Sequence, residues 1–141
     1  MNVDKLLKAL DNNENESIIN FTSDKIIEMN IKIIEELGLT REETINILMK
    51  LKNYKYVDEI EDLKYGTYLR WIPIEDVDHL VLTKGAVFCD LKITDNGLFL
   101  ICKNIHHKYF QISMDKNLLF QKLTNQELII LQTIDQIQSH N

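Results

Sequence analysis

Residues 86–104 read AVFCDLKITDNGLFLICKN, and this stretch decides the fold that the sequence predicts. Two apolar-rich runs flank Asn96 and Gly97, and Asn-Gly is the dipeptide that best tolerates the positive φ angles of a tight hairpin turn. We therefore predict a β-hairpin with Asn96 and Gly97 as its two-residue loop. In that register Asp90 faces Lys103, which makes an opposite-charge cross-strand pair.

The predicted register gives the hairpin two unequal faces. One face is apolar away from its ends and is expected to lie in the core; it carries Val87, Cys89, Leu91, Ile93, Leu100 and Cys102. The other face carries Phe88, Phe99 and Ile101, which is too apolar for a purely solvated surface. Either a helix covers these three side chains, or they form a patch that binds a protein partner.

The charge of the chain is unevenly distributed. Residues 1–62 contain 8 basic and 14 acidic side chains, hence −6, whereas residues 63–141 contain 8 of each, hence zero. Affinity for phosphate comes mainly from Lys and Arg, so the N-terminal half is disfavoured as a nucleic-acid surface. The neutral second half leaves binding of nucleic acid open.

The chain of 141 residues suits one domain, or a compact domain with a helical appendage. No apolar run approaches the roughly 18–20 residues that span a bilayer, and the N-terminus is too polar and acidic for a signal peptide. The two cysteines fall on predicted strands and read as buried thiols of a reducing compartment. We therefore expect a cytoplasmic protein with no membrane partner.

The first 62 residues are predicted to be helical. Residues 1–17 are interpreted as a flexible segment with a short amphipathic helix from Val3 to Leu10, followed by the polar run DNNENES. Residues 18–62 are predicted to form an αα-hairpin, with helices near 24–37 and 40–53, and an acidic connector.

Asn30 is the exception within the apolar stripe of the first long helix. Helical spacing places it among isoleucines, so a buried Asn30 needs a hydrogen-bond partner for its amide. The second helix opens with the capping box T-x-x-E formed by Thr40 and Glu43. Its acidic first turn would repel phosphate, which disfavours reading of DNA by this helix pair.

Residues 63–141 are predicted to form about five short strands with tight turns and then a helix, which Thr124 and Glu127 begin with a second capping box. The order of helices, strands and a last helix indicates an α+β fold. We expect an N-terminal αα-hairpin, a small five-stranded antiparallel barrel or bent sheet, and a C-terminal helix.

The sequence contains none of the common catalytic or phosphate-binding motifs, so we expect no enzymatic activity and no cofactor. Cys89, Cys102, His106 and His107 are the only plausible metal ligands, but they lack the C-x-x-C spacing of zinc sites. We therefore interpret the cysteines as core thiols, the histidines as a surface turn, and predict no metal.

A resemblance covers residues 63–123. The pattern L-x-x-G-x-Y-L-R-W-I, then L-T-K-G-A-V-x-C-D, then F-L-I-C-K-N and F-Q-K-L is similar to small SH3-like or Tudor-like barrels, in particular to uncharacterised proteins of nucleocytoplasmic large DNA viruses. The matching positions are Gly66, Arg70, Trp71, Gly85, Asp90, Cys102, Lys103, Asn104 and Phe120. The resemblance implies an SH3-like barrel of a viral protein, made in host cytoplasm or carried in the virion, and brings no catalytic residues.

Two functions follow as hypotheses. The first is a non-enzymatic interaction or structural module of a viral assembly, which binds a protein partner or itself through Phe88, Phe99 and Ile101. The second is a module that binds single-stranded nucleic acid in viral gene expression; its residues are Arg70, Trp71, Lys92 and Lys103. Aromatic residues of this half are also expected in the core, and the sequence leaves these alternatives open.

Overall fold

The structure, a computed structural model, describes residues 2–139; Met1, His140 and Asn141, which the predicted ranges 1–17 and 63–141 include, lie outside the described residues. The helices are α1 (Val3–Asp11), α2 (Ser23–Glu35), α3 (Arg41–Lys50) and α4 (Asn125–Ser139), with the 3₁₀ helices η1 (Asn13–Ile18) and η2 (Ile60–Asp62). The strands are β1 (Tyr54–Tyr56), β2 (Tyr68–Pro73), β3 (Ala86–Thr94), β4 (Gly97–Lys103), β5 (Tyr109–Ser113) and β6 (Asn117–Lys122).

The strands form one open antiparallel sheet in the order β1-β6-β2-β3-β4-β5. The α+β class, the αα-hairpin and the C-terminal helix are confirmed. The five-stranded barrel is not what the structure shows, because the sheet has six strands and is not closed. The additional strand, β1, lies in the segment that we predicted to be a connector; it is only three residues long, so it gives no periodic signal.

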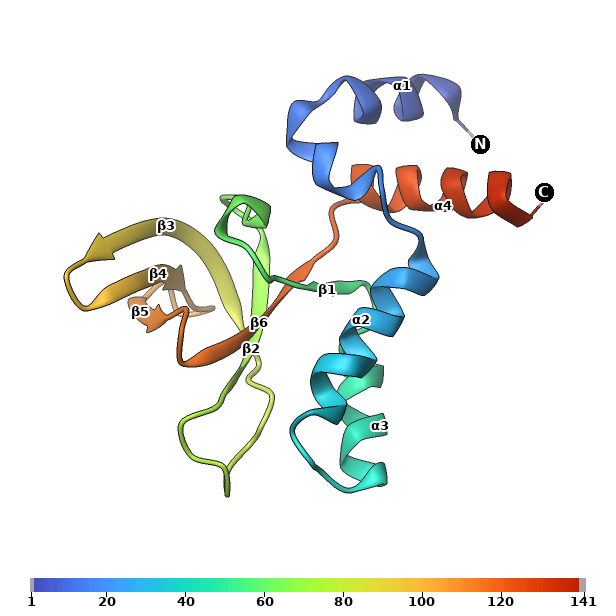
Figure 1. Cartoon of the computed structure of the whole chain (residues 1–141). Coiled ribbons are helices and arrows are strands. Elements are labelled where there is room, and N and C mark those ends of the chain that lie inside the picture. Colours follow the sequence, from blue (N-terminus) through green and yellow to red (C-terminus); the bar gives the residue numbers. More distant parts are fainter. Residues whose placement is uncertain (1, 140–141) are drawn as a thin grey trace.

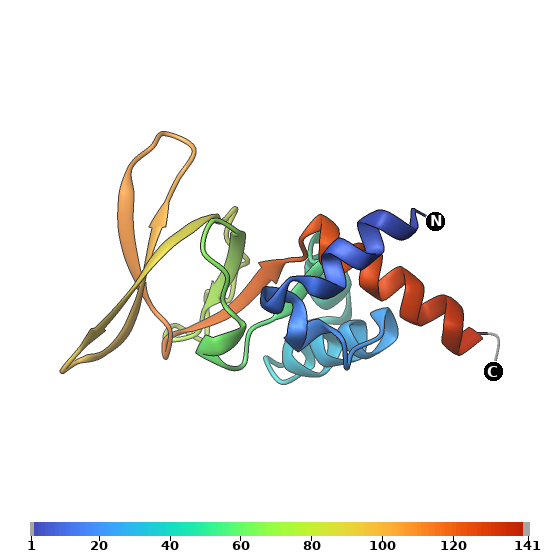
Figure 2. The same ribbon diagram turned by 90° about the horizontal axis from the view of Figure 1, so that it is seen from above.

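The helices gather at one end of the sheet (Figure 1). β3, β4 and β5 bend away from them as a twisted ribbon, whereas β1 and β6 lead into the helical part (Figures 1 and 2). α1 packs along one side of α4, and α2 contacts α4, α3 and β1. None of the helices within residues 2–139 therefore lies over the central part of the β3–β4 hairpin, so the alternative of a helical cover is not found there.

The turn of the central hairpin differs from the predicted one. Thr94 faces Gly97, so the two turn residues are Asp95 and Asn96. Gly97 alone takes the positive φ, at 122°. Thr94 fixes the turn, because its Oγ1 donates to the Gly97 carbonyl at 3.1 Å and accepts from the Asn96 amide at 3.2 Å. Asn-Gly thus marks the turn correctly but not its register.

A β-bulge at Cys89 changes which residues of β3 face the core. The register shifts between Phe88 and Asp90, which leaves one residue unpaired and turns the strand. Phe88 moves from the predicted outer face into the core and is only 1% exposed. The predicted pair of Asp90 with Lys103 is wrong, because Asp90 lies opposite Ile101.

The predicted capping box of Thr124 and Glu127 is complete, whereas that of Thr40 and Glu43 is formed in part, because the Glu43 carboxylate bonds the Thr40 hydroxyl and not its amide. Thr124 Oγ1 accepts from the Glu127 amide at 3.1 Å, and Glu127 Oε1 accepts from the Thr124 amide at 2.9 Å. Thr40 Oγ1 accepts from the Glu43 amide at 3.2 Å and donates to the Glu43 carboxylate at 2.9 Å. These bonds satisfy amides that the first helical turn leaves without partners.

The N-terminal segment is more ordered in secondary structure than the sequence indicated. The polar run at residues 11–17 was predicted as a loop, but η1 occupies most of it and buries Asn15 and Ile18. The Asn15 amide donates to the Ala9 carbonyl at 2.8 Å and to Gln126 Oε1 at 3.0 Å. The second of these bonds links the segment to α4, because Gln126 belongs to α4 and lies 111 residues after Asn15 in the chain.

Asn30 joins the helices to the sheet. Its side chain is buried within α2 and lies against the outer edge of β1. Nδ2 donates to the Tyr54 carbonyl at 2.9 Å, and Oδ1 accepts from the Tyr56 amide at 3.0 Å. One side chain therefore satisfies the edge strand as a neighbouring strand would, and the predicted need of a partner for a buried Asn30 is confirmed.

We expect Asn30→Leu to lower the free energy of unfolding by about 2–4 kcal/mol, because it leaves a carbonyl and an amide of β1 without partners. Urea denaturation followed by circular dichroism measures this. Asn46→Leu is the matched control, since Asn46 is exposed on α3. A loss for Asn30→Leu no larger than that of the control would show that water replaces the side chain without cost.

Candidate functional site

An apolar hollow with a volume of about 400 Å³ lies between α2, α3 and α4. We call it the α2–α4 groove and define it by its principal lining residues, Ile27, Ile31, Leu48, Leu51, Leu128 and Leu131. Its volume and its aliphatic lining are typical of sites that bind apolar ligands or side chains.

The width of the apolar stripe on α2 produces this groove. Ile26 and Ile34 are buried and hold α2 in place, whereas Ile27, one step around the helix, is 54% exposed. Ile27 and Ile31 therefore form a wall that no element of the described chain covers completely. A contiguous apolar surface that stays uncovered is a candidate contact surface.

Several polar groups around the groove are already engaged in hydrogen bonds. Asn30 is bonded to β1, and the Asp135 carboxylate accepts from Ser23, at 2.6 Å from the hydroxyl and 3.1 Å from the amide. Burial raises the pKa of the Tyr54 hydroxyl above its ordinary value, so this side chain stays neutral. The groove thus offers a mainly apolar surface, with the exposed Lys52 among its lining residues.

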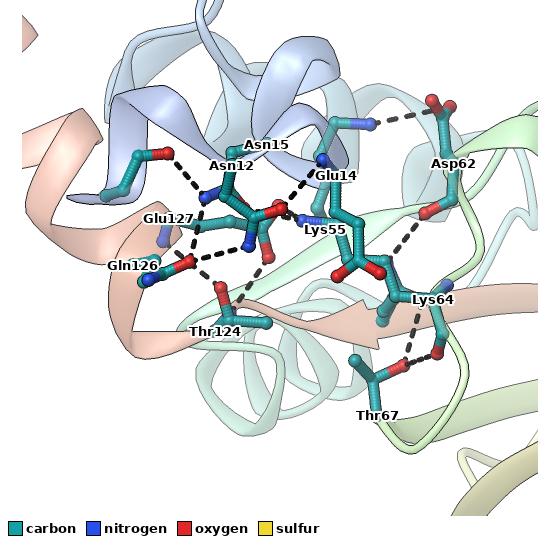
Figure 3. Close-up of polar contacts among 12 residues, drawn as sticks. Asn12, Glu14, Asn15, Lys55, Asp62, Lys64, Thr67, Thr124, Gln126 and Glu127 are labelled. Carbon is teal, nitrogen blue, oxygen red and sulfur yellow. Dashed lines mark hydrogen bonds and ion pairs between the residues drawn. The ribbon is translucent and has the colours of Figure 1, made fainter. Parts of the chain in front are cut away.

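A second group of residues, shown in Figure 3, is polar and buried. Lys64 Nζ lies 3.2 Å from Glu127 Oε2 and donates to Asn15 Oδ1 at 3.0 Å; the Lys64 and Glu127 side chains are 10% and 4% exposed. Glu127 belongs to α4 and Asn15 to η1, so the Lys64 ammonium joins the connector before β2 to both helical segments.

Gln121 completes this network from β6. Its Oε1 accepts from the Lys64 amide at 2.8 Å, and its Nε2 donates to the Asp62 carbonyl at 2.9 Å. Lys55 lies nearby, with its ammonium 4.7 Å from the centre of the Phe21 ring and 3.8 Å from Asp62 Oδ2. Each charge in the network has an oppositely charged or polar partner. We therefore interpret the network as a structural feature that holds the chain segments together, and not as a reactive site.

The predicted patch of Phe88, Phe99 and Ile101 is divided by the fold. Phe88 is buried in the core, and the exposed Tyr65 ring stacks on it, with ring centroids 5.2 Å apart. Phe99 and Ile101 stay half-buried on the uncovered face of β3 and β4. Only these two residues of the patch are placed to contact a partner.

The four residues predicted for nucleic acid are also separated. Trp71 is buried against Phe110, and Arg70 donates from Nε to the Thr83 carbonyl at 2.9 Å. Lys92 and Lys103 remain on the uncovered face of β3 and β4, where Lys92 lies opposite Phe99. The Lys103 ammonium lies 5.8 Å from the centre of the exposed Tyr109 ring.

The thiols do not form a metal site. Cys102 is fully buried, and burial, with a smaller effect of Cys89, raises the pKa of its thiol to about 12. Within residues 2–139, no three His, Cys, Asp or Glu side chains lie close enough together to hold a metal ion. A protonated Cys102 is inert toward thiol chemistry at neutral pH.

From the sequence we identified the apolar isoleucines of α2 but expected them in the core. We did not identify Leu128 or the ion pair of Lys64 and Glu127. The sequence does contain a signal for the groove. The apolar stripe of α2 is wider than the surface that one neighbouring element can cover, so part of it is expected to stay uncovered. No local sequence pattern indicates the ion pair, because Lys64 and Glu127 are 63 residues apart in the chain and come together only in the folded protein.

Comparison with protein-family models, with curated proteins and with solved structures finds no significant match to this chain. The resemblance to viral SH3-like proteins therefore stays a prediction. Among the helices of residues 2–139, none has the length and apolar character that crossing a bilayer requires.

We expect Lys64→Met to destabilise the protein by about 3–5 kcal/mol, because the Glu127 carboxylate is then buried without its cation. Adding Glu127→Gln restores part of the loss, since the double variant buries no unpaired charge. Thermal and urea denaturation measure both. Lys122→Met, at an exposed position of β6, is the control. Equal losses of stability for Lys64→Met and Lys122→Met would refute the structural role of the buried ion pair.

Proposed function

We propose that this protein is a non-enzymatic interaction module whose α2–α4 groove receives the apolar face of an amphipathic helix. The observation that supports this is the exposed Ile27 beside the half-buried Ile31, at an apolar hollow of about 400 Å³. Helix-in-groove recognition uses such a surface, with anchors spaced by three or four residues.

The dimensions of the groove favour a helix as the ligand. A shallower hollow, lined by Gln132, Gln136 and Ser139, continues the groove along α4. From Leu128 to Ser139 the α4 axis extends about 16 Å at 1.5 Å per residue. That length matches three turns of a bound helix and exceeds what a single side chain would occupy.

We place this module in a virion or in the assembly of a large DNA virus, as the SH3-like resemblance of residues 63–123 suggests. The order of the last five strands, β6-β2-β3-β4-β5, supports relating this part to small bent sheets of that kind. Phe99 and Ile101 are secondary contact residues in this proposal, since no helix covers them.

The groove is tested with helical peptides selected from a displayed library on the wild-type protein. We expect Ile27→Asp to weaken binding of the selected peptides at least tenfold, because it places a charge on the apolar wall. Ile93→Asp is the matched control, since Ile93 is 77% exposed on the distant hairpin. Fluorescence anisotropy measures both, and peptides that bind all three proteins equally would refute the groove as their site.

A second candidate function is binding of single-stranded nucleic acid, and one observation favours it. The uncovered face of β3, β4 and β5 brings Lys92 beside Phe99 and Lys103 beside Tyr109, a cation next to an aromatic ring in each case. Stacking rings with interspersed cations are the recurrent means of binding unpaired bases.

We expect this face to bind a labelled oligothymidine of about 12 nucleotides weakly at low salt. Lys92→Gln together with Lys103→Gln should reduce the slope of log affinity against log salt concentration by about 2. Lys32→Gln with Lys50→Gln removes the same charge from exposed helical positions and is the control. No detectable binding by the wild type at low salt would exclude this candidate.

A further inference from the structure

β5 is an edge of the sheet, and no strand of residues 2–139 pairs with its outer side. The Met114 amide donates to the Leu98 carbonyl at 3.0 Å, which shows that the even-numbered residues of this segment bond β4. In an antiparallel pair the alternate residues direct their amides and carbonyls the other way. The backbone groups of Tyr109, Gln111 and Ser113 therefore point away from β4, to the open side of the strand.

Two further edges of the sheet are protected. At β1 the Asn30 side chain bonds the outer carbonyl and amide. β3 pairs with β2 only at its start; beyond that point it has the bulge at Cys89 and the charged Asp90, whose Oδ1 accepts from the Leu91 amide at 2.8 Å. Covering groups, bulges and charges are the means by which proteins keep edges from pairing. β5, with the sequence YFQIS, carries no charge, no proline and no bulge.

We propose that β5 of one copy pairs antiparallel with β5 of a second copy, with Gln111 opposite Gln111. In this register Tyr109 lies opposite Ser113 of the second copy, so every outward residue meets another outward residue. The opposed residues exchange about six backbone hydrogen bonds. The Ser113 carbonyl already accepts from Asn117 Nδ2 at 2.7 Å, but a carbonyl oxygen has a second lone pair. A register moved by two residues would leave an outward residue of the strand unopposed.

The apolar side chains of β5 favour its own copy as the partner. Phe110 and Ile112 are half-buried and pack at the border of the core. In the proposed register Phe110 lies opposite Ile112 of the second copy, and Ile112 lies opposite Phe110. Pairs of an aromatic with a β-branched residue are among the favourable cross-strand pairs. The contact therefore continues the apolar layer of each copy into the other.

The turns at the two ends of β5 differ in charge. Lys108, which follows two histidines, lies before the strand, and Asp115 lies after it; both are exposed. Lys116 is next to Asp115, but its ammonium is paired with Glu75 at 3.1 Å. Antiparallel pairing places Lys108 of each copy at the end of the strand where the other copy has Asp115. A parallel arrangement would place like charges together instead.

The contact uses the same strand of both copies, so it is isologous and closes with two copies. The protected edges at β1 and β3 agree with an assembly that grows no further. The helices lie at the other end of the molecule and do not obstruct β5 (Figures 1 and 2). A contact of one five-residue strand is small, so we expect a dimer whose population depends on concentration. It does not involve the α2–α4 groove and does not rest on the proposed function.

Because Gln111 lies opposite itself, the charge of residue 111 tests the register directly. Gln111→Lys and Gln111→Glu each place like charges face to face, whereas a mixture of the two variants places opposite charges there. Sedimentation velocity of the full chain from about 5 to about 500 µM measures association. We expect wild type to dimerise as concentration rises and each variant alone to associate several-fold more weakly. The equimolar mixture should associate more strongly than either variant alone.

Gln111→Pro tests the backbone bonds. The Gln111 amide does not bond β4, so proline is compatible with this edge position, but the contact loses the bonds that this amide donates. We expect association to weaken about tenfold or more. Gln111→Thr keeps the amide and a residue that favours strands, and it is the matched control, expected to associate like wild type. Circular dichroism verifies that each variant is folded, and if the proline variant is not, the charged variants still decide.

Three results would overturn the inference: a wild type that is monomeric throughout the range, charged variants that each associate like wild type, or a mixture no stronger than its components. Ile27→Asp should dimerise like wild type. Dimers that Ile27→Asp abolishes and Gln111→Lys keeps would place the contact at the α2–α4 groove and would also overturn it. Binding of helical peptides to the groove is measured separately, so the two proposals fail independently.

Discussion

The position of the helices depends on the side chain of Asn30. β1 is an edge strand, and its outer carbonyl and amide need partners once α2 covers them. The Asn30 amide supplies both, at 2.9 and 3.0 Å, and so fixes α2 against the sheet at one rotation and one height. The α2–α4 groove lies between α2, held in this way, and its neighbours α3 and α4.

The buried pair of Lys64 and Glu127 has a different role. Replacing a buried ion pair by apolar residues is often neutral, so such a pair is weak evidence for stability. Here its bonds reach η1 and α4 from one ammonium group, and Gln121 adds the connector and β6. We interpret the network as a device that specifies one arrangement of four chain segments, since any other arrangement would leave a charge unpaired.

The protein has two candidate binding surfaces besides the edge of β5, and they differ in chemistry. The helical end is acidic and aliphatic, and it holds the α2–α4 groove. The uncovered face of β3, β4 and β5 combines lysines with aromatic rings. The first suits helices and the second suits unpaired bases, and because they lie at opposite ends of the molecule (Figure 2) the two candidate functions do not exclude one another.

The sequence by itself determined the elements whose signals are local. The capping boxes at Thr40 and Thr124 and the apolar stripe of α2 each depend on residues within one or two turns, so their positions were predicted correctly. Only the tertiary structure decided the rest. The bulge at Cys89 moved Phe88 into the core, and β1 formed because α2 and β6 lie on its two sides. The groove lies where α2 and α4, which are distant in the chain, come together. These features depend on contacts between residues distant in the chain, which no local pattern encodes.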